Sequence, residues 1–328
     1  MPEPSLIDGF GRRIDYLRVS VTDRCDMRCS YCMPVGFKGF EEPANWLTHP
    51  QSIRLVHLFA SLGVRKVRIT GGEPLLRRGV VDLARGYRCH PGITDLSLST
   101  NGAALAQHAA ALRQAGVQRL NISLDSLDEE RFKQLTQRDV LPAVLDGIEA
   151  ARQASFEAIK LNMVVQPGVN LDELEAMMRF ARHKGLVLRL IEPMPMGSTG
   201  RATSGCDLTR LGEAMAAEWG LLPDAGPPGA GPARYWRDPG SGFSLGVITP
   251  MSRHFCQACN RVRLTVDGRL LLCLGQEDAV PLGELMRAGA SDQDLVAAIR
   301  SGIDRKPERH QFTERPDQVV RFMSATGG

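Results

Sequence analysis

The chain has few aromatic residues, little net charge and no long apolar segment. Of its 328 residues 5% are aromatic, and the net charge is only +3. A nucleic-acid coat protein needs a basic stripe and stacking aromatics, so the composition argues against a nucleic-acid partner. No segment offers the roughly 18 consecutive apolar residues of a membrane helix, and residues 1–13 lack the apolar stretch of a signal peptide. We therefore expect a cytoplasmic protein with no membrane partner.

What the first 190 residues do contain is a regular alternation of β-rich and helical patterns. Strands are expected at 16–21, 66–70, 94–99, 118–124, 158–165 and 187–191, with helices near 51–62, 80–89, 104–115, 142–154 and 171–184 between them. This alternation is typical of parallel β/α units. Six units are too few to close an eight-stranded barrel. The prediction is an α/β fold in which residues 1–200 form a partial, laterally open (β/α)6 TIM-like barrel.

The alternation ends after residue 200. A helix is expected near 208–219, followed by a loop or linker at 223–232, which is dense in proline and glycine. Strands near 244–249, 261–266 and 269–273 and helices near 281–288 and 292–302 come next. Residues 201–328 are therefore predicted to form a small α+β module that caps the barrel mouth.

Three cysteines follow the first predicted strand at C-x3-C-x2-C spacing: Cys25, Cys29 and Cys32. Thiolates this close indicate a metal site. A [4Fe–4S] cluster usually takes four cysteines, so a set of three leaves one iron open for a ligand that is not protein. A zinc site completed by a histidine such as His49 is the alternative, but zinc arrays typically come as paired C-x2-C units. The spacing favours iron and sulfide.

A second set of three cysteines, Cys256, Cys259 and Cys273, has the spacing C-x2-C-x13-C. A zinc ribbon completed by His254 is an open alternative, because C-x2-C is a common zinc half-site. The first set favours an iron–sulfur cluster over zinc at the second set, since a chain that carries one iron–sulfur cluster is a good candidate for another. We expect two clusters, each with an open iron.

The chain contains eight cysteines in all. Two tight groups persist as thiolates only in a reducing compartment, which agrees with a cytoplasmic location. Cys89 and Cys206 lie outside both groups, and each is expected to be a buried or incidental thiol.

The first cysteine set, with Tyr31 just before its last member, resembles the signature of the radical S-adenosylmethionine (SAM) enzymes. Two further motifs narrow the likeness: Gly71-Gly72-Glu73-Pro74 after the second predicted strand, and the segment 256–263 followed by Cys273. With these motifs the chain resembles the GTP 3′,8-cyclase family of molybdenum cofactor biosynthesis. The likeness runs from residue 16 to a terminal di-glycine.

This resemblance implies two [4Fe–4S] clusters, the first binding SAM and the second binding GTP. It implies a radical lyase reaction in which a 5′-deoxyadenosyl radical takes hydrogen from C3′ of the ribose. The carbon radical then attacks C8 of guanine, and 3′,8-cyclo-7,8-dihydro-GTP is the product. The implied partners are GTP, a reductant, the downstream cyclic pyranopterin monophosphate synthase and, in a possible homodimer, a second copy of the chain.

The resemblance also implies roles for individual residues. It assigns SAM binding to Tyr31, Gly72, Glu73, Ser123 and Met194, and GTP binding to Arg18, Arg68, Thr100, Lys160, Arg261 and Arg263, the last two also being catalytic. The residues alone allow plainer interpretations, since Gly71–Pro74 could be a simple turn and Met194 could fill a core. The family's di-glycine tail, here Gly327–Gly328, is thought to reach the active site, although a disordered terminus is also compatible with the sequence.

Two other functions stay open at this stage. One is a different radical SAM enzyme with an auxiliary cluster, such as a peptide maturase, although those usually carry more cysteines in the C-terminal part. The other is a zinc-stabilised nucleic-acid-binding module, which leaves the β/α alternation and the Gly-Gly-Glu-Pro motif without a role.

Overall fold

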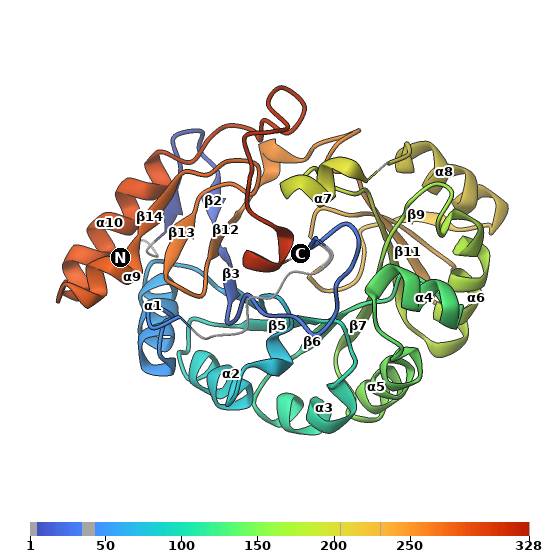
Figure 1. Ribbon diagram of the computed structural model, residues 1–328, viewed down its shortest axis with the longest axis horizontal. Coiled ribbons are helices and arrows are strands. Elements are labelled where there is room, and N and C mark those ends of the chain that lie inside the picture. The colour runs from blue at the N-terminus through green and yellow to red at the C-terminus, as the bar shows by residue number, and fades with distance from the viewer. Residues whose placement is uncertain (1–4, 35–42, 204, 230, 328) are drawn as a thin grey trace.

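The central feature is a curved sheet built from parallel strands (Figure 1). The computed structural model describes residues 5–34, 43–203, 205–229 and 231–327. Six parallel strands follow one another in chain order: β3 (Tyr16–Ser20), β4 (Lys66–Thr70), β5 (Asp95–Thr100), β6 (Arg119–Ser123), β7 (Ala158–Val164) and β8 (Val187–Ile191). In β3, Leu17 and Val19 belong to the apolar core, and Arg18 between them lines a cavity. One face of the strand therefore packs in the apolar core, and the other face points into the barrel interior.

Helices cover the outer face of the curved sheet (Figure 1). They are α1 (His49–Ser61), α2 (Val80–Arg88), α3 (Leu105–Gln114), α4 (Glu129–Thr136), α5 (Leu141–Gln153) and α6 (Leu174–Lys184). Local sequence explains their ends. Thr48 and Gln51 form a capping box at the start of α1, and Gly185 ends α6 in a left-handed conformation.

The C-terminal part of the chain continues the same sheet at both edges. At one edge β11 (Ser244–Ile248) pairs in parallel with β8 and is followed by β10 (Arg234–Arg237) and β9 (Leu222–Asp224). At the other, β12 (Arg261–Leu264) pairs in parallel with β3 and is followed by β13 (Arg269–Leu271) and β14 (Ala279–Pro281). Apart from β1 and β2, the described strands thus form one open twelve-stranded sheet. The sequence predicted a small C-terminal module at the barrel mouth, and the structure adds that its strands pair with both edge strands of the barrel, whose unpaired edges would be unfavourable.

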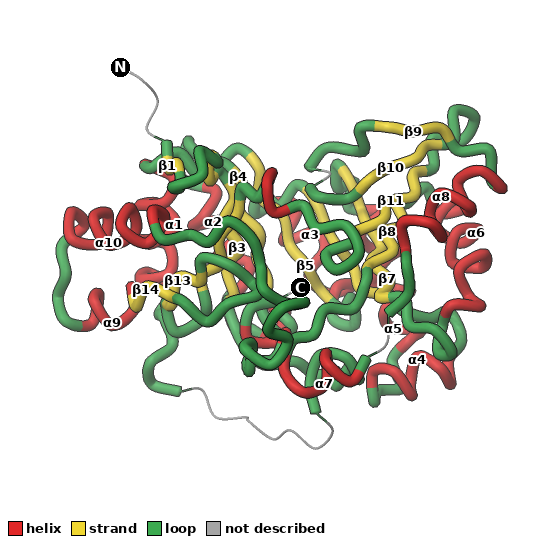
Figure 2. The backbone as a smooth tube through the Cα atoms, turned by 90° about the horizontal axis from the view of Figure 1, so that it is seen from above, coloured by secondary structure: helices red, strands yellow, loops and turns green. Residues whose placement is uncertain are grey.

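The remaining elements complete the two ends of the sheet. They are the hairpin β1 (Leu6–Ile7) and β2 (Arg13–Ile14), and the helices α7 (Gly197–Ala202), α8 (Leu208–Glu218), α9 (Leu282–Arg287) and α10 (Asp292–Asp304). Figures 1 and 2 both place the C-terminal end of the chain in the middle of the molecule, between the two halves of the curved sheet. No helix among the described residues is long and apolar enough to cross a membrane.

The predicted elements match the structure closely, with a few omissions. Each predicted barrel strand occurs within two residues of its expected bounds. The sequence analysis missed α4, although Asp128 caps it by accepting a hydrogen bond from the Arg131 N–H at 2.8 Å. It also missed α7, β9, β10, β14 and the N-terminal hairpin, which are too short to show a period.

Candidate active site

The first cysteine set lines a cavity at the C-terminal ends of the barrel strands. This first cavity contains Cys25, Cys29 and Cys32. All residues predicted to bind SAM line it as well: Tyr31, Gly72, Glu73, Ser123 and Met194. The structure therefore brings together segments that are up to about 170 residues apart in the sequence. Barrel enzymes carry out their chemistry at this end, the carboxyl ends of the parallel strands.

The three thiols of the first cavity are half-buried. Burial, followed by the charge of Glu73, raises the pKa of Cys25 to about 12. Burial, followed by the charge of Asp125, raises the pKa of Cys32 to about 12 as well. Buried thiols become thiolates only where positive charge compensates them, and the irons of a cluster supply that charge. The donor set therefore fits a [4Fe–4S] cluster.

The paired glycines after β4, Gly71 and Gly72, allow the backbone before Cys25 to pack closely against them. A Cβ on Gly72 would lie 2.1 Å from the carbonyl oxygen of Arg24, and one on Gly71 would lie 2.2 Å from that of Thr22. In this space the Gly72 N–H donates to the Thr22 carbonyl at 2.9 Å, and the Glu73 N–H donates to the Arg24 carbonyl at 2.6 Å. These backbone donors hold the segment that precedes Cys25.

The Glu73 carboxylate is fixed at the wall of the first cavity. It accepts hydrogen bonds from the Thr100 hydroxyl at 2.7 Å, the Asn101 N–H at 2.6 Å and the Leu75 N–H at 3.0 Å. Burial raises the pKa of Glu73 to about 7, although these donors oppose the shift. A carboxylate held this rigidly is suited to receive an ammonium group of a ligand.

The sequence analysis missed a second carboxylate in this cavity, Asp125. It accepts hydrogen bonds from the Tyr31 hydroxyl at 2.7 Å and from the Val164 N–H at 2.8 Å. Burial raises the pKa of Asp125 to about 6. Asp125 lies two residues after the end of β6, and that position near the carboxyl end of a strand was the available signal.

The second cysteine set lines a neighbouring cavity inside the barrel. Cys256, Cys259 and Cys273 are joined there by the predicted substrate residues Arg18, Arg68, Arg261 and Arg263. Arg189 and Lys306, which the sequence analysis did not select, also line this second cavity. Asn162, Ile191 and Met194 line both cavities, so the two cysteine sets face adjoining spaces.

Three buried arginines lie in register across three neighbouring strands of the second cavity. Arg263 on β12 pairs with Arg18 on β3, and Arg18 pairs with Arg68 on β4. Each is 6–8% exposed, and neighbouring strands lie about 4.8 Å apart. Burial, followed by the charges of Arg263 and Arg68, lowers the pKa of Arg18 well below its usual range. This arginine row concentrates positive charge on one wall.

The same wall holds donors without partners. The buried Nε atoms of Arg18 and Arg261 and the hydroxyl of Tyr16 have no hydrogen-bond partner among the described residues. The guanidinium groups of Arg68 and Arg261 lie 5.5 and 5.8 Å from the centre of the Tyr16 ring. Burial alone raises the pKa of Tyr16, but Arg68, Arg18 and Arg261 together lower it to about 8. The wall is prepared for an anionic ligand with several acceptor oxygens.

The C-terminal tail reaches this site. Arg263 Nη1 donates to the carbonyls of Thr326 and Gly327 at 3.2 and 2.7 Å. Gly327 has a φ of +67°, and a Cβ there would lie 2.0 Å from the Thr70 hydroxyl oxygen. The backbone at Gly327 therefore fits between β4 and β12 only as glycine. Gly328 lies outside the described residues.

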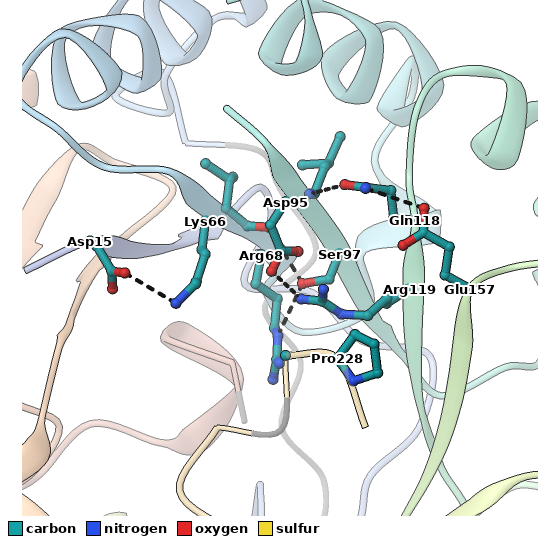
Figure 3. Close-up of polar contacts among 12 residues, drawn as sticks. Asp15, Lys66, Arg68, Asp95, Ser97, Gln118, Arg119, Glu157 and Pro228 are labelled. Atoms are coloured by element: carbon teal, nitrogen blue, oxygen red, sulfur yellow. Dashed lines mark hydrogen bonds and ion pairs between the residues drawn. The ribbon is translucent and has the colours of Figure 1, made fainter. Parts of the chain in front are cut away.

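Two predicted substrate residues do not line the second cavity. Thr100 lines the first cavity and donates to Glu73. Lys160 is 1% exposed, and its ammonium donates to the carbonyls of Pro228 and Gly229, both at 2.9 Å. Figure 3 shows Pro228 beside Arg68 and Arg119, close to the ion pair that Arg119 forms with Asp95. The loop that contains Pro228 thus covers the N-terminal ends of the strands.

Neither histidine proposed as a zinc ligand completes a site. Across the part of the chain that the structure describes, no group of three or more His, Cys, Asp or Glu side chains is placed to hold one metal ion. His254 instead packs edge to face on His310, with 5.7 Å between the ring centres. Each cysteine of a [4Fe–4S] cluster binds a separate iron, so the cluster does not require convergence on one point.

Comparison with known proteins identifies families whose sequences match the chain and solved structures that share its fold. Residues 19–181 match the radical SAM superfamily, and residues 186–312 match the family described as Molybdenum Cofactor Synthesis C. Among solved structures, SuiB of Streptococcus suis gives a TM-score of 0.64 at 14% identity, covering 95% of this chain and 77% of SuiB. SuiB bound to S-adenosylmethionine gives 0.62 at 14% identity, with 88% and 68% covered. Identity this low shows the common fold alone.

The fold and the first cysteine set therefore define a radical SAM protein. The GTP 3′,8-cyclase of Pseudomonas fluorescens is 48% identical to the chain, and that of Marinobacter nauticus is 45% identical, each over 100% of both chains. The GTP 3′,8-cyclase of Pseudomonas putida is 47% identical over 99% of this chain and 98% of its own. The chain belongs to the GTP 3′,8-cyclase family. This membership sets aside the peptide-maturase and zinc-module alternatives.

Proposed function

We infer that the protein converts GTP to 3′,8-cyclo-7,8-dihydro-GTP in the first step of molybdenum cofactor biosynthesis. Its relatives are GTP 3′,8-cyclases over their full length. The observation that carries the inference is the buried arginine row of Arg263, Arg18 and Arg68 beside the second cysteine set. Several buried guanidinium groups that have no carboxylate partner among the described residues fit a triphosphate, because guanidinium binds phosphate oxygens through paired hydrogen bonds.

We propose that the first cavity binds SAM and the second cavity binds GTP. The first cluster, when bound, supplies the electron that cleaves SAM. Glu73 and Gly72 orient the methionine end of SAM, and Tyr31, Ser123 and Met194 form the rest of the binding wall, since all five line the first cavity. Asn162 and Met194 lie where the cavities adjoin, so they are suited to hold the ribose close to the site of SAM cleavage.

In the second cavity we assign Arg261 and Arg263 as catalytic residues that contact GTP, with Arg18 and Arg68 as further phosphate ligands. The arrangement adds Arg189 to this group, because it lines the same cavity and is 2% exposed. Thr100 and Lys160 fit supporting roles better. Thr100 holds Glu73, and Lys160 anchors the loop at Pro228 and Gly229.

Several further features belong to the proposal. The functional boundary between the SAM-binding part and the substrate-binding part lies near residue 200. A reductant supplies the electron, cyclic pyranopterin monophosphate synthase consumes the product, and a second copy of the chain is proposed as a partner in a homodimer. A cytoplasmic location is supported by the eight cysteines, all of which are free thiols, because such thiols persist in a reducing compartment.

The experiment is to measure GTP affinity and product formation under anaerobic conditions for Arg263→Ala and Arg18→Met. Each charge-assisted contact contributes roughly 1.5–3 kcal/mol, so each variant should bind GTP at least about tenfold more weakly. Arg18→Met is included because Arg263 also holds the tail. Arg269→Ala on β13 is the control, since Arg269 is exposed and outside both cavities. Wild-type affinity in both iron-replete cavity variants would refute the assignment.

A further inference from the structure

A buried lysine lies against the second cysteine set. Lys306 follows α10, is 2% exposed and lines the second cavity together with Cys256, Cys259 and Cys273. Its ammonium donates to the carbonyl of Leu272 at 2.6 Å. Leu272 immediately precedes Cys273 in the chain. Lys306 therefore contacts the backbone that carries one of the three thiols.

Lys306 differs from Arg12, a neighbouring cation whose side chain is also buried. Arg12 donates to the Cys256 carbonyl at 2.8 Å and to the Pro307 carbonyl at 2.7 Å, but its charge is balanced by a buried ion pair with Asp8 at 2.6 Å. No ion pair with a carboxylate occurs for Lys306 among the described residues. A buried ammonium without a countercharge is unfavourable, so the compensating negative charge has to come from the cavity that it lines.

The three thiols are the available source of that negative charge. Burial raises the pKa of Cys256 and Cys273, and the charge of Lys306 opposes this shift. At Cys259 burial also raises the pKa, but the charges of Lys306 and Arg261 lower it overall. Cluster binding converts these half-buried thiols to thiolates and so concentrates negative charge in one place. A fixed ammonium at the same place offsets part of this charge.

We propose that Lys306 is a positioning residue for the second cluster. Its ammonium compensates the charge of the three thiolates, and its hydrogen bond to Leu272 fixes the backbone before Cys273. A fixed positive charge stabilises the reduced form of a cluster more than the oxidised form, because reduction adds negative charge. Lys306 therefore raises the reduction potential of the second cluster. The proposal rests on the second cluster and does not depend on the identity of the substrate.

The experiment compares full-length, anaerobically reconstituted protein with Lys306→Met, Lys306→Arg and Arg305→Met, in the absence of GTP. Arg305→Met is a matched control, because it removes one positive charge from the residue next to Lys306. The Arg305 side chain is half exposed and pairs with Asp278 at 3.6 Å. Iron and sulfide are counted per chain, and reduction is followed by electron paramagnetic resonance at set potentials. The signal that Cys259→Ala eliminates identifies the second cluster.

Lys306→Met should lower the ratio of reduced to oxidised second cluster at a fixed potential at least tenfold, which corresponds to 59 mV for one electron. Lys306→Arg should restore most of the ratio, and Arg305→Met should leave it unchanged. If Lys306→Met loses the second cluster and Lys306→Arg retains it, the need for charge is also supported. Wild-type iron content and potential in Lys306→Met would overturn the proposal, as would loss of the cluster in both lysine variants. Failure of the GTP assignment would leave all these readouts unaffected.

Discussion

Replacing Gly72 with alanine tests whether the paired glycines hold the cysteine loop. The added Cβ would lie 2.1 Å from the Arg24 carbonyl oxygen and 2.4 Å from its carbon, whereas real Cβ contacts under 3.0 Å are essentially absent. The backbone before Cys25 would therefore have to retreat by 3.0 − 2.1 = 0.9 Å. The φ of Gly72 is outside the left-handed region, so this contact alone is the source of the effect.

A retreat of this size breaks two hydrogen bonds, from the Gly72 N–H to Thr22 and from the Glu73 N–H to Arg24. At about 0.5–1.5 kcal/mol each, their loss costs roughly 1–3 kcal/mol. Cys25 follows Arg24 directly, so its thiol moves with the loop. We expect Gly72→Ala to lose iron from the first cluster while keeping the second, and to form 5′-deoxyadenosine at least tenfold more slowly.

The assay combines iron content after anaerobic reconstitution with 5′-deoxyadenosine formed from SAM under dithionite. Gly240→Ala is the matched control, because its Cβ would meet nothing closer than 3.4 Å, an ordinary contact at an exposed turn. If Gly72→Ala kept the iron content and SAM cleavage of the wild type, the close approach would have no role in seating the cluster.

Three other outcomes are expected. Cys29→Ala should abolish SAM cleavage, since the loss of one thiolate unseats the first cluster; full 5′-deoxyadenosine formation would contradict this. Cys259→Ala should leave SAM cleavage in place but weaken GTP binding, which calorimetry with GTP can check, and unchanged affinity would give the second cluster another role. Burial raises the pKa of Glu73 to about 7 and of Asp125 to about 6, so these two carboxyls bind more protons in the folded metal-free chain than in the unfolded chain. The free energy of unfolding in urea of the wild type, relative to that of a Glu73→Gln, Asp125→Asn variant, should therefore fall as pH rises from about 4 to 7, and a rise in this difference would refute the argument.

The sequence predicted the barrel strands and the cysteine sets because each is a local pattern. A strand such as Val187–Ile191 is visible as a short apolar run after a helical period. The first cysteine set lies within eight residues, and the second lies within residues 256–273. Sheet order at the edges was not visible. The pairing of β12 with β3 joins segments about 240 residues apart, and no local signal specifies such a partner.

Residues whose role depends on three-dimensional neighbours were the ones missed. In the sequence, Arg189 cannot be told apart from the many arginines that are solvated. Only the fold shows that Arg189 on β8 lines the second cavity. Lys306 follows a helix end, where a lysine is ordinarily exposed. Its burial arises because the segment after α10 packs beneath Leu272.

The pairing of β12 with β3 also sets an order in time for a chain made from its N-terminus. Ser20 ends β3 and Arg261 begins β12, so residues 21–260, about 240 in number, separate the end of one strand from the start of its neighbour. At about 5–20 residues per second, synthesis of that interval takes roughly 12–48 s. Throughout it one edge of β3 has no partner, and the cysteine loop that follows β3 emerges long before the second cysteine set. Exposed strand edges invite association with other chains, so the nascent protein is most vulnerable to aggregation in the interval when only its first cluster site has been made.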